Sequence, residues 1–379
     1  MDFELSEEQK LIQDTAYKFA VKEFEPIAKE CDREEKRPEG LLQKGAEIGL
    51  VGITIPEEYG GGGLGFLELA LVTEQLSRVD MGLGSVVITS AFGSENIQFF
   101  GTEEQKKKYL PPLVTGKAAT SGAYTEPNAG TDVAATRTKA VKDGDEYVIT
   151  GNKMFITNGS FADWFITLCV TNPDNKRFQR HSLILIESDR KGITVNKIHG
   201  KMGMRASDTT EIAFEEVRVP CANLIGKEGN AFPQLMHFFD ATRTMVAAQG
   251  IGLAQGALDK TLTYIKEREV FGKPIIANQG VQFIVAEMAT KIELARTLDY
   301  RAAWYVDQGK TNPSLNAMAK YFAGETAVWV CDKALQLHGG YGYIDEYDVQ
   351  RYYRDAKVLE IYEGAKEAEK LTIARMMMK

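Results

Sequence analysis

The sequence predicts an α+β chain of several domains, in which two helical regions enclose a β-region. Its 379 residues exceed the length of one ordinary domain, so two or three domains are expected. Apolar residues recur at helical spacing near both ends, whereas short strand-like runs crowd the middle. We therefore place a helical domain at 1–120, a β-domain at 121–229 and a second helical domain at 230–379.

The N-terminal region opens with a helix-start signal. Ser6 is followed three residues later by Gln9, which is the spacing of a capping box. Apolar side chains then recur at helical spacing from Leu11 to Ala20. The stretch GTEEQKKKYL, 101–110, completes a region that is expected to be helical.

The middle region has the spacing of a small antiparallel β-structure. Asp143-Gly144 separates two strand-like runs and predicts a hairpin. Further strand-like runs follow at short intervals without intervening helices: 164–170, 181–187, 192–198 and 209–220. Short strands at such intervals predict a barrel or a sandwich.

The C-terminal region returns to helical patterns. Apolar residues between Leu253 and Ile265 recur about one helical turn apart. The stretches 281–309 and 314–337 contain almost no Gly or Pro. Long helices are therefore expected here.

Composition argues against several classes of function. The chain is 44% hydrophobic and 26% charged, as in globular proteins, and its net charge of −8 argues against general nucleic-acid binding. No apolar run reaches the roughly 18–20 residues of a membrane span, so stable membrane insertion is not expected. The acidic N-terminus is unlike a targeting leader. We expect a cytoplasmic, bacterial-type location, or the mitochondrial matrix if a leader has been removed.

The cysteines and histidines give no sign of a metal site. The four cysteines, Cys31, Cys169, Cys221 and Cys331, are far apart and form no C-x-x-C pair. This spacing favours reduced thiols over a disulfide framework or a zinc site. The four histidines are equally scattered, so no metal is expected.

Two stretches of the middle region could present groups to a ligand. The stretch YTEPNAGTD, 124–132, is rich in hydroxyls and turn formers, and it could equally be a plain surface turn. In GNKMFITNG, 151–159, Phe155 and Thr157 share one side of a strand. They could flank a flat heterocycle, or Phe155 could belong to the core.

Three features of the C-terminal region are equally open. Asp240 and Arg243 lie one helical turn apart, as an intrahelical pair or as a phosphate-binding arginine and its partner. The stretches KEREVFGKPI, 266–275, and QLHGGYGY, 336–343, end helices at glycines. The second could approach a pyrophosphate or merely cap its helix.

The stretch IYEGAKEAEK, 361–370, combines a charged helix with one carboxylate in a different setting. Lys366 and Lys370 sit among Glu363, Glu367 and Glu369 at the spacing of an exposed helix. Glu363, however, lies where an apolar segment becomes a charged one. It is either one more surface carboxylate or a base held in a dry pocket.

Several motifs in order are more specific than any one of them: GLVGITIPEEYGG (49–61), GTEEQKKKYLPPL (101–113), YTEPNAGTD, KMFITNG, KMGMRASDTTEIAFEEVRVP (201–220), REVFGKPI, LHGGYGY and YRDAKVLEIYEG. With them the chain resembles the acyl-CoA dehydrogenase family of flavoproteins nearly from end to end. The resemblance implies an N-terminal helical domain, a middle antiparallel β-barrel and a C-terminal four-helix bundle. It also implies a homotetramer built as a dimer of dimers.

The resemblance implies FAD as the cofactor, shared between two subunits. One subunit would line the flavin, with Phe155 against the ring and Thr157 bonded to its N5, through Gly122, Ala123, Tyr124, Thr125, Thr131, Phe155, Ile156 and Thr157. A neighbouring subunit would hold the ADP half through Arg268, Val270, Phe271, Asn278, Gln279, Gln336, Gly339 and Gly340. Ala365 and Glu367 also match positions near FAD, although Ala365 lacks the hydroxyl of the threonine usual there.

The resemblance further implies an acyl-CoA substrate and names its base. Positions that meet the substrate are matched by Thr131, Asp240, Arg243, Gly364 and Arg375. Glu363 matches the catalytic base of short- and medium-chain members. Other branches carry the base immediately before the helix arginine, where this chain has Thr242.

The implied reaction is α,β-dehydrogenation of an acyl-CoA to the trans-2-enoyl-CoA. Glu363 would take the α-proton while the β-hydride passes to flavin N5. Exclusion of water would raise the pKa of Glu363, and hydrogen bonds to the thioester oxygen would stabilise the developing enolate. The electrons would then pass to an electron-transfer flavoprotein.

Alternatives stay open within and outside this reaction. The chain could act on a cyclic, branched or dicarboxylic acyl-CoA, or run as an enoyl-CoA reductase. The resemblance implies that glutaryl-type members tend to carry an arginine near residues 82–90, and its absence from MGLGSVVITS, 81–90, argues against a dicarboxylic substrate. The alternative of another class is a non-catalytic CoA- or flavin-binding assembly protein, which the presence of Glu363 disfavours. The sequence does not distinguish acyl chain length, direction or electron acceptor.

Overall fold

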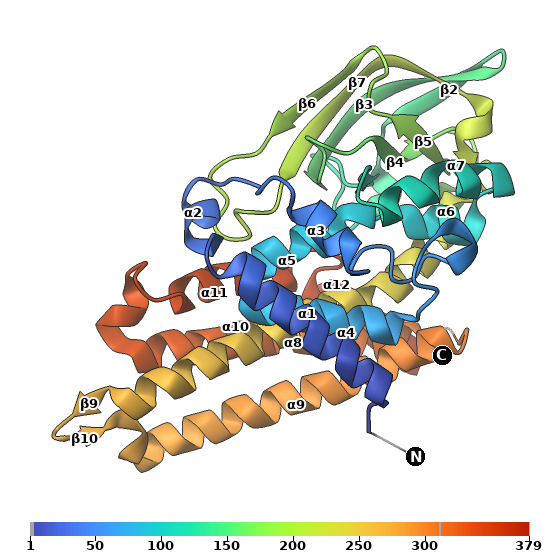
Figure 1. The fold of residues 1–379 in the computed structure, drawn as a ribbon. Coiled ribbons are helices and arrows are strands. Elements are labelled where there is room, and N and C mark those ends of the chain that lie inside the picture. The colour runs from blue at the N-terminus through green and yellow to red at the C-terminus, as the bar shows by residue number, and fades with distance from the viewer. Residues whose placement is uncertain (1–3, 311, 379) are drawn as a thin grey trace.

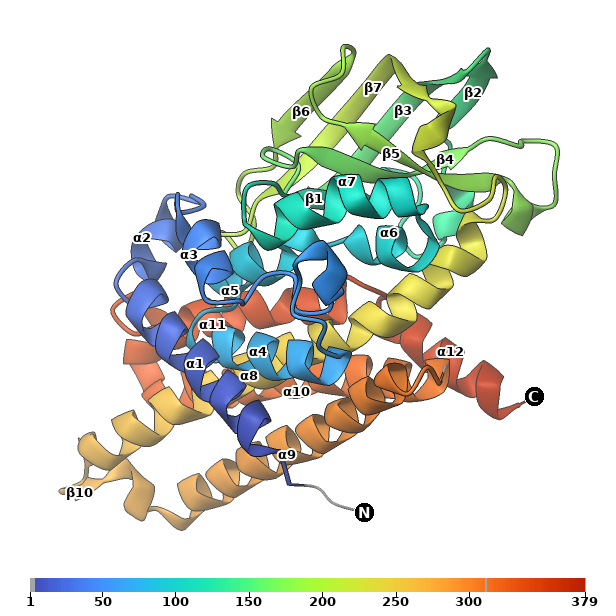
Figure 2. The ribbon, with the colours of Figure 1, turned by 45° about the vertical axis from the view of Figure 1, so that its right-hand side comes forward.

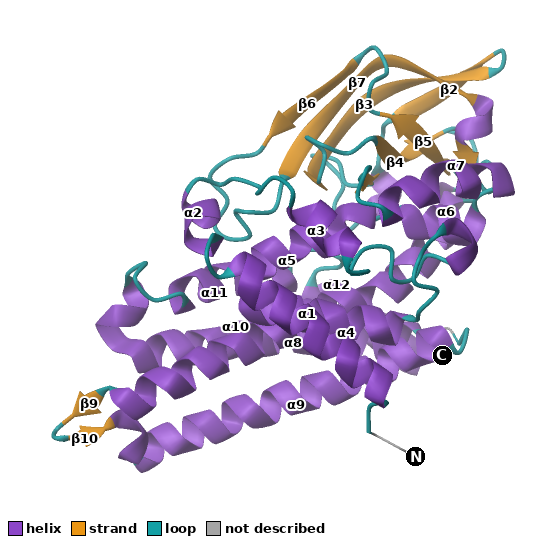
Figure 3. Ribbon diagram, in the orientation of Figure 1, coloured by secondary structure: helices purple, strands orange, loops and turns teal. Residues whose placement is uncertain are grey.

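Helices and strands occupy separate parts of the molecule. The computed structural model describes residues 4–310 and 312–378. Figure 3 shows one large sheet at one end, helices through the rest, and a small hairpin at the opposite end. The order along the chain is helices, then strands, then helices, which confirms the predicted arrangement.

The N-terminal region is helical, as predicted. Its helices are α1 (Glu7–Phe24), α2 (Ala28–Arg33), α3 (Leu41–Glu47), α4 (Phe66–Val79), α5 (Met81–Ile88), α6 (Ser94–Phe100) and α7 (Glu103–Val114). The predicted capping box at Ser6 and Gln9 is present at the start of α1. Asp80 ends α4 and caps α5, because its side chain accepts the N–H of Leu83 at 2.8 Å.

The middle region forms one sheet of mixed direction. Its strands are β1 (Thr120–Ala123), β2 (Lys139–Asp143), β3 (Glu146–Thr157), β4 (Trp164–Val170), β5 (His181–Glu187), β6 (Ile193–Lys197), β7 (Thr209–Pro220) and β8 (Leu224–Ile225). They lie in the order β6-β7-β3-β2-β4-β5-β8, with β1 pairing in parallel with β4. The predicted hairpin joins β2 to β3, and Gly144 takes a φ of 62° in its turn.

The prediction of a closed antiparallel barrel is wrong in two respects. Among the described residues β6 and β8 end the sheet without pairing to each other, and β4 pairs in parallel with both β1 and β2. Phe165 and Ile184 face the residues of β7 across an internal core. The opposite faces of β4 and β5 pack against α7. This side of the sheet is therefore covered by a helix and is not exposed to solvent.

The C-terminal region is built on three long helices that lie side by side (Figures 1 and 2). Its elements are α8 (Ala231–Glu267), β9 (Glu269–Val270), β10 (Lys273–Pro274), α9 (Gln279–Asp307), α10 (Pro313–His338), α11 (Val349–Ala356) and α12 (Lys366–Met377). Helix α12 packs on α10, and α8 packs on both α10 and α4. Buried residues of α4, α5, α8 and α10 form one continuous core, so the two helical domains are joined through it.

No helix within residues 4–310 or 312–378 combines the length and apolar character needed to cross a membrane. The same residues contain no group of three or more potential metal ligands arranged around one point.

Close packing between α8 and α4 gives a stability prediction. A Cβ added at Gly252 would lie 2.1 Å from the carbonyl oxygen of Glu74, which is backbone and cannot move cheaply. We expect Gly252→Ala to lower the free energy of unfolding by about 1–3 kcal/mol, because the two helices must separate. Urea denaturation followed by circular dichroism measures the change.

The matched control is Gly280→Ala in α9, where an added Cβ would meet no atom within 4 Å. This variant should be neutral or more stable by up to about 1 kcal/mol, because alanine favours the helix. Equal urea midpoints for Gly252→Ala and wild type would contradict the packing shown here.

Candidate active site

Glu363 lies in the short segment between α11 and α12, where the backbone turns sharply. Glu363 has a φ of 52° and Gly364 a φ of 101°, both in the left-handed region. The φ of Gly364 favours glycine, and a Cβ there would also lie 1.9 Å from Oε1 of Glu369. The turn therefore holds the Glu363 backbone in a conformation that residues other than glycine rarely adopt.

Charged side chains from three helices hold this turn. Lys320 on α10 donates to the carbonyl oxygen of Gly364 at 2.5 Å. Arg243 on α8 donates to Glu369 on α12 at 3.1 Å and to Asp240 at 2.5 Å. The intrahelical pair, one of the two alternatives for Asp240 and Arg243, is therefore present, and it belongs to a larger network.

The carboxylate of Glu363 is partly buried and has few partners. Burial raises its pKa to about 7, although the charges of Arg243 and Lys320 and a hydrogen bond from Thr242 act in the other direction. Thr242 Oγ1 lies 3.2 Å from Glu363 Oε2 and 3.2 Å from the carbonyl oxygen of Phe238, and its single proton serves only one of them. Glu363 is thus a weakly solvated carboxylate that titrates near neutral pH.

Two of these supporting residues were not predicted as part of a site. Glu369 is 1% exposed, so its placement on an exposed helix face was wrong, whereas Lys366 does pair with Glu360 at 2.9 Å near the surface. Lys320 is 1% exposed, and burial lowers its pKa to about 8. The signal available in the sequence was a single lysine in the otherwise apolar stretch AMAKYFAG, 317–324.

A second group of predicted residues meets at the edge of β1 and β3. Met154 N–H donates to the carbonyl oxygen of Thr125 at 3.0 Å, and the Ser121 hydroxyl donates to the carbonyl oxygen of Thr157. The stretch after β1 is therefore beside the end of β3. This brings together Gly122, Ala123, Tyr124 and Thr125 with Phe155, Ile156 and Thr157.

Phe155 lies outside the core. It takes a φ of 60°, and its side chain is 65% exposed, so the core alternative is wrong. The pairing of β3 with β7 is irregular between Lys153 and Ile156, which turns Phe155 outward. Ile156 and Tyr124 are buried, so only their backbone atoms face the same space.

The stretch 124–132 is more than a plain surface turn. Lys153 is fully buried and donates to Glu126 at 2.9 Å, to Leu168 at 2.7 Å and to Tyr124 at 3.3 Å. Glu126 also accepts the N–H of Thr138 at 2.9 Å. A buried ion pair with this many hydrogen bonds fixes the start of the stretch, while Thr131 at its far end is exposed.

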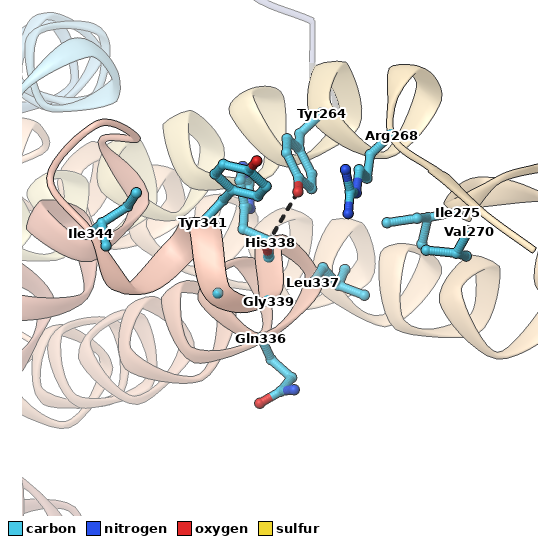
Figure 4. Close-up of a pocket in the computed structure, with 11 residues that line it drawn as sticks. Tyr264, Arg268, Val270, Ile275, Gln336, Leu337, His338, Gly339, Tyr341 and Ile344 are labelled. Carbon is cyan, nitrogen blue, oxygen red and sulfur yellow. Dashed lines mark hydrogen bonds between the residues drawn. The ribbon is translucent and has the colours of Figure 1, made fainter.

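A third group lines a cavity of about 530 Å³ at the other end of the molecule (Figure 4). Five of the predicted cofactor residues line it: Arg268, Val270, Gln336, Gly339 and Gly340. Figure 4 shows the Arg268 side chain between Tyr264 and Val270 on one wall. Three predicted residues do not line the cavity: Phe271, Asn278 and Gln279, which are exposed beside it.

The structure does not bring all predicted site residues together in one chain. In Figures 1 and 2 the β9–β10 hairpin, next to this cavity, lies at the end of the molecule farthest from the sheet. Asp240, Arg243 and Gly364 adjoin Glu363, whereas Arg375 is exposed in the last turn of α12. Ala365 immediately precedes α12, and Glu367 is exposed in its first turn.

The residues present fit a flavin. The exposed ring of Phe155 lies at the edge of the sheet. The segments around Thr125 and Thr157 lie beside it, at the start of the stretch 124–132. The cavity near the hairpin offers one cation, paired glycines and two tyrosines, which suits a phosphate-bearing adenosine group.

Comparison with known proteins assigns each of the three regions to a domain of one protein family. Models of the acyl-CoA dehydrogenase N-terminal, middle and C-terminal domains match residues 6–117, 121–217 and 229–378.

Similar proteins match over almost their whole length. The chain is 44% identical to acryloyl-CoA reductase (NADH) of Anaerotignum propionicum, covering 100% of this chain and 96% of that one. It is 43% identical to the short-chain-specific acyl-CoA dehydrogenase of Clostridium acetobutylicum, covering 99% of each. A solved chain described under the electron transferring flavoprotein of Acidaminococcus fermentans is 42% identical, with a TM-score of 0.97 and complete coverage of both chains.

The raised pKa of Glu363 predicts a pH-dependent gain in stability for Glu363→Gln. Between about pH 4.5 and 7 the folded protein holds a proton that the unfolded chain has released, so wild-type stability falls as pH rises through this window. In Glu363→Gln the side chain is neutral at every pH, so this loss of stability does not occur. We expect the variant to gain on the order of 1–3 kcal/mol at pH 8 and much less at pH 5, measured by urea denaturation.

The control is Glu325→Gln, a glutamate on α10 that pairs with Lys370 near the surface. It should show no comparable gain that grows with pH. An effect of Glu363→Gln that is the same at pH 5 and pH 8 would show that Glu363 is not desolvated.

Proposed function

Because the chain belongs to the acyl-CoA dehydrogenase family, we propose that it removes hydrogen from the α and β carbons of an acyl-CoA, with Glu363 as the base. The observation that carries this proposal is the partly buried Glu363 carboxylate, whose pKa is raised to about 7 by burial. A base with a pKa near the working pH exists in its deprotonated form and still holds an abstracted proton well.

Residues of this chain would bind, orient and deprotonate the substrate. The α-carbon of the thioester must face the Glu363 carboxylate, because proton transfer needs hydrogen-bond distance. The backbone N–H of Glu363 would donate to the thioester oxygen and stabilise the negative charge that develops there. Glycine at position 364 would let the backbone pass close to the thioester.

The cofactor proposed for these residues is FAD, which supplies a hydride acceptor when bound. Phe155 would pack on the flavin ring, with Thr125 and Thr157 beside it. The cavity with Arg268 and Gln336 would hold the ADP half of an FAD bound mainly by a neighbouring copy, because the hairpin beside the cavity lies at the end of the chain opposite the sheet that carries Phe155.

We also propose a homotetramer, because large apolar side chains are exposed beside this cavity and along α9. Phe271 is fully exposed, and Phe283, Leu294 and Trp304 are exposed along the length of α9. Large exposed apolar areas mark interaction sites. A neighbouring copy would cover them and complete the FAD site.

The electron acceptor we propose is an electron-transfer flavoprotein, supported by the similarity to a chain described with such a protein. A second direction is supported by the similarity to acryloyl-CoA reductase. In that direction Glu363 would return a proton to the α-carbon. Comparing the rates with butyryl-CoA and with crotonyl-CoA, in the presence of the electron-transfer flavoprotein, tests which direction dominates.

The base is tested by Glu363→Gln. We expect the variant to keep its FAD and to lose at least about a hundredfold in the rate of flavin bleaching by butyryl-CoA, because the amide cannot accept the α-proton. Visible spectroscopy gives FAD content, and stopped-flow absorbance gives the rate. Glu325→Gln should match wild type in both, and near-normal bleaching by Glu363→Gln would refute the assignment.

The shared cofactor site is tested by Arg268→Ala. This variant should retain FAD roughly tenfold less tightly, because it loses a charged donor to phosphate, while its mass by light scattering stays that of a tetramer. Lys273→Ala, an exposed lysine on the same hairpin, is the control. An unchanged FAD affinity in Arg268→Ala would remove this cavity from the cofactor site.

A further inference from the structure

A second buried carboxylate, Glu95, lies next to the residues proposed for the flavin and has no assigned role. It sits in the first turn of α6 and is 7% exposed. The preceding turn packs tightly on β1, because a Cβ at Gly93 would lie 3.3 Å from the backbone nitrogen of Gly122. Glu95 therefore belongs to the wall between the N-terminal helices and the start of β1.

Contacts link this wall to Glu363. Asn96 donates to the Tyr124 hydroxyl at 2.9 Å, and the Tyr124 ring meets the Phe238 ring edge-on at 5.6 Å. The carbonyl oxygen of Phe238 lies 3.2 Å from Thr242 Oγ1, which in turn is 3.2 Å from Glu363. The charge of Glu363 acts on Glu95 directly and contributes to raising its pKa, after burial, to about 7.

Glu95 lacks the partners that a buried carboxylate needs. Its carboxylate accepts the N–H of Gly93 at 2.9 Å and is affected by its own backbone N–H, but no Lys, Arg or His pairs with it within the part of the chain that the structure describes. The neighbouring Asn96 Oδ1 is also buried without a donor. A buried carboxylate without a cation and a buried amide oxygen without a donor are both costly, and a donor on a ligand would offset that cost.

We propose that Glu95 binds a hydrogen-bond donor, a hydroxyl or an ammonium group, carried by the acyl chain beyond the two reacting carbons. This inference rests on the proposed function, in which the α-carbon lies beside Glu363 and the β-carbon beside the flavin. Only the acyl chain beyond these two carbons is then free to reach Glu95. The substrate is then a short acyl-CoA with a polar end, in place of a plain alkyl chain.

The side chains around Glu95 favour a polar end group over an alkyl end. Phe92 and Phe239 flank Phe238 and Tyr124 with apolar rings, and these offer no hydrogen bond to a polar end group. An alkyl end would bury the Glu95 carboxylate against carbon and leave it unpaired. A hydroxyl or ammonium end removes that cost, and its own desolvation is offset by the hydrogen bond that it makes to a carboxylate.

The test separates binding from catalysis. FAD-loaded Glu363→Gln protein binds thioesters without turnover, and isothermal titration gives the Kd of each. Two matched pairs are compared, 5-hydroxypentanoyl-CoA with hexanoyl-CoA and 4-hydroxybutyryl-CoA with pentanoyl-CoA, in which the hydroxyl replaces a methyl. A further ligand, 5-aminopentanoyl-CoA, provides the ammonium.

We expect at least one polar ligand to bind roughly ten- to a hundredfold more tightly than its alkyl match. Adding Glu95→Met should abolish or reverse this preference. Adding Glu95→Gln should keep the preference for a hydroxyl, which an amide oxygen also accepts, but lose any preference for the ammonium. Flavin content and circular dichroism confirm that both variants are folded.

Two results would overturn the proposal. One is that alkyl ligands bind as tightly as their polar matches in the Glu363→Gln background. The other is that Glu95→Met leaves the preference unchanged. Because these are binding constants, they stand even if wild-type protein oxidises none of the thioesters, which would instead refute the proposed function.

Discussion

The Glu363 carboxylate, the proposed base, is held where burial disfavours its ionised form. Burial raises the pKa of Glu363 above its ordinary value, and the positive charges of Arg243 and Lys320 limit that rise. Glu369 neutralises part of Arg243 and also occupies the space that a Cβ at position 364 would need. The geometry of the turn and the acidity of its carboxylate thus depend on the same few side chains.

The site exists only because three parts of the chain meet. Tyr362, beside the base, donates to Gln249 of α8 at 2.5 Å, and Gln249 donates to Ser85 of α5 at 3.0 Å. The sheet is joined to the same helices by Asn158, which donates to the carbonyl oxygen of Thr89 at 2.6 Å. The continuous core of α4, α5, α8 and α10 makes these junctions rigid. The residues proposed for the flavin at the sheet edge and the proposed base on the helical side are then held in fixed relation.

Periodicity predicted what depends on local sequence, and the resemblance predicted the family. The helix start at Ser6 and the hairpin at Gly144 follow from residues close in the chain, and both are confirmed. Spacing could not show that Glu369 is buried, because its environment comes from α8 and α10 far away in sequence. Nor could it show Phe155 turned outward, since that requires an irregular pairing with β7. Sheet closure was wrong for the same reason, because the helices that cover β4 and β5 are distant elements.

The most direct measurement is the rate of flavin reduction by acyl-CoA as a function of pH, under anaerobic single-turnover conditions with substrate below its Kd. The free protein's base then determines the profile. If Glu363 accepts the proton, the second-order rate constant should rise with pH and level off above a pKa of about 7. A profile that is flat from pH 5 to 9, or the absence of reduction by every acyl-CoA tried, would contradict the account.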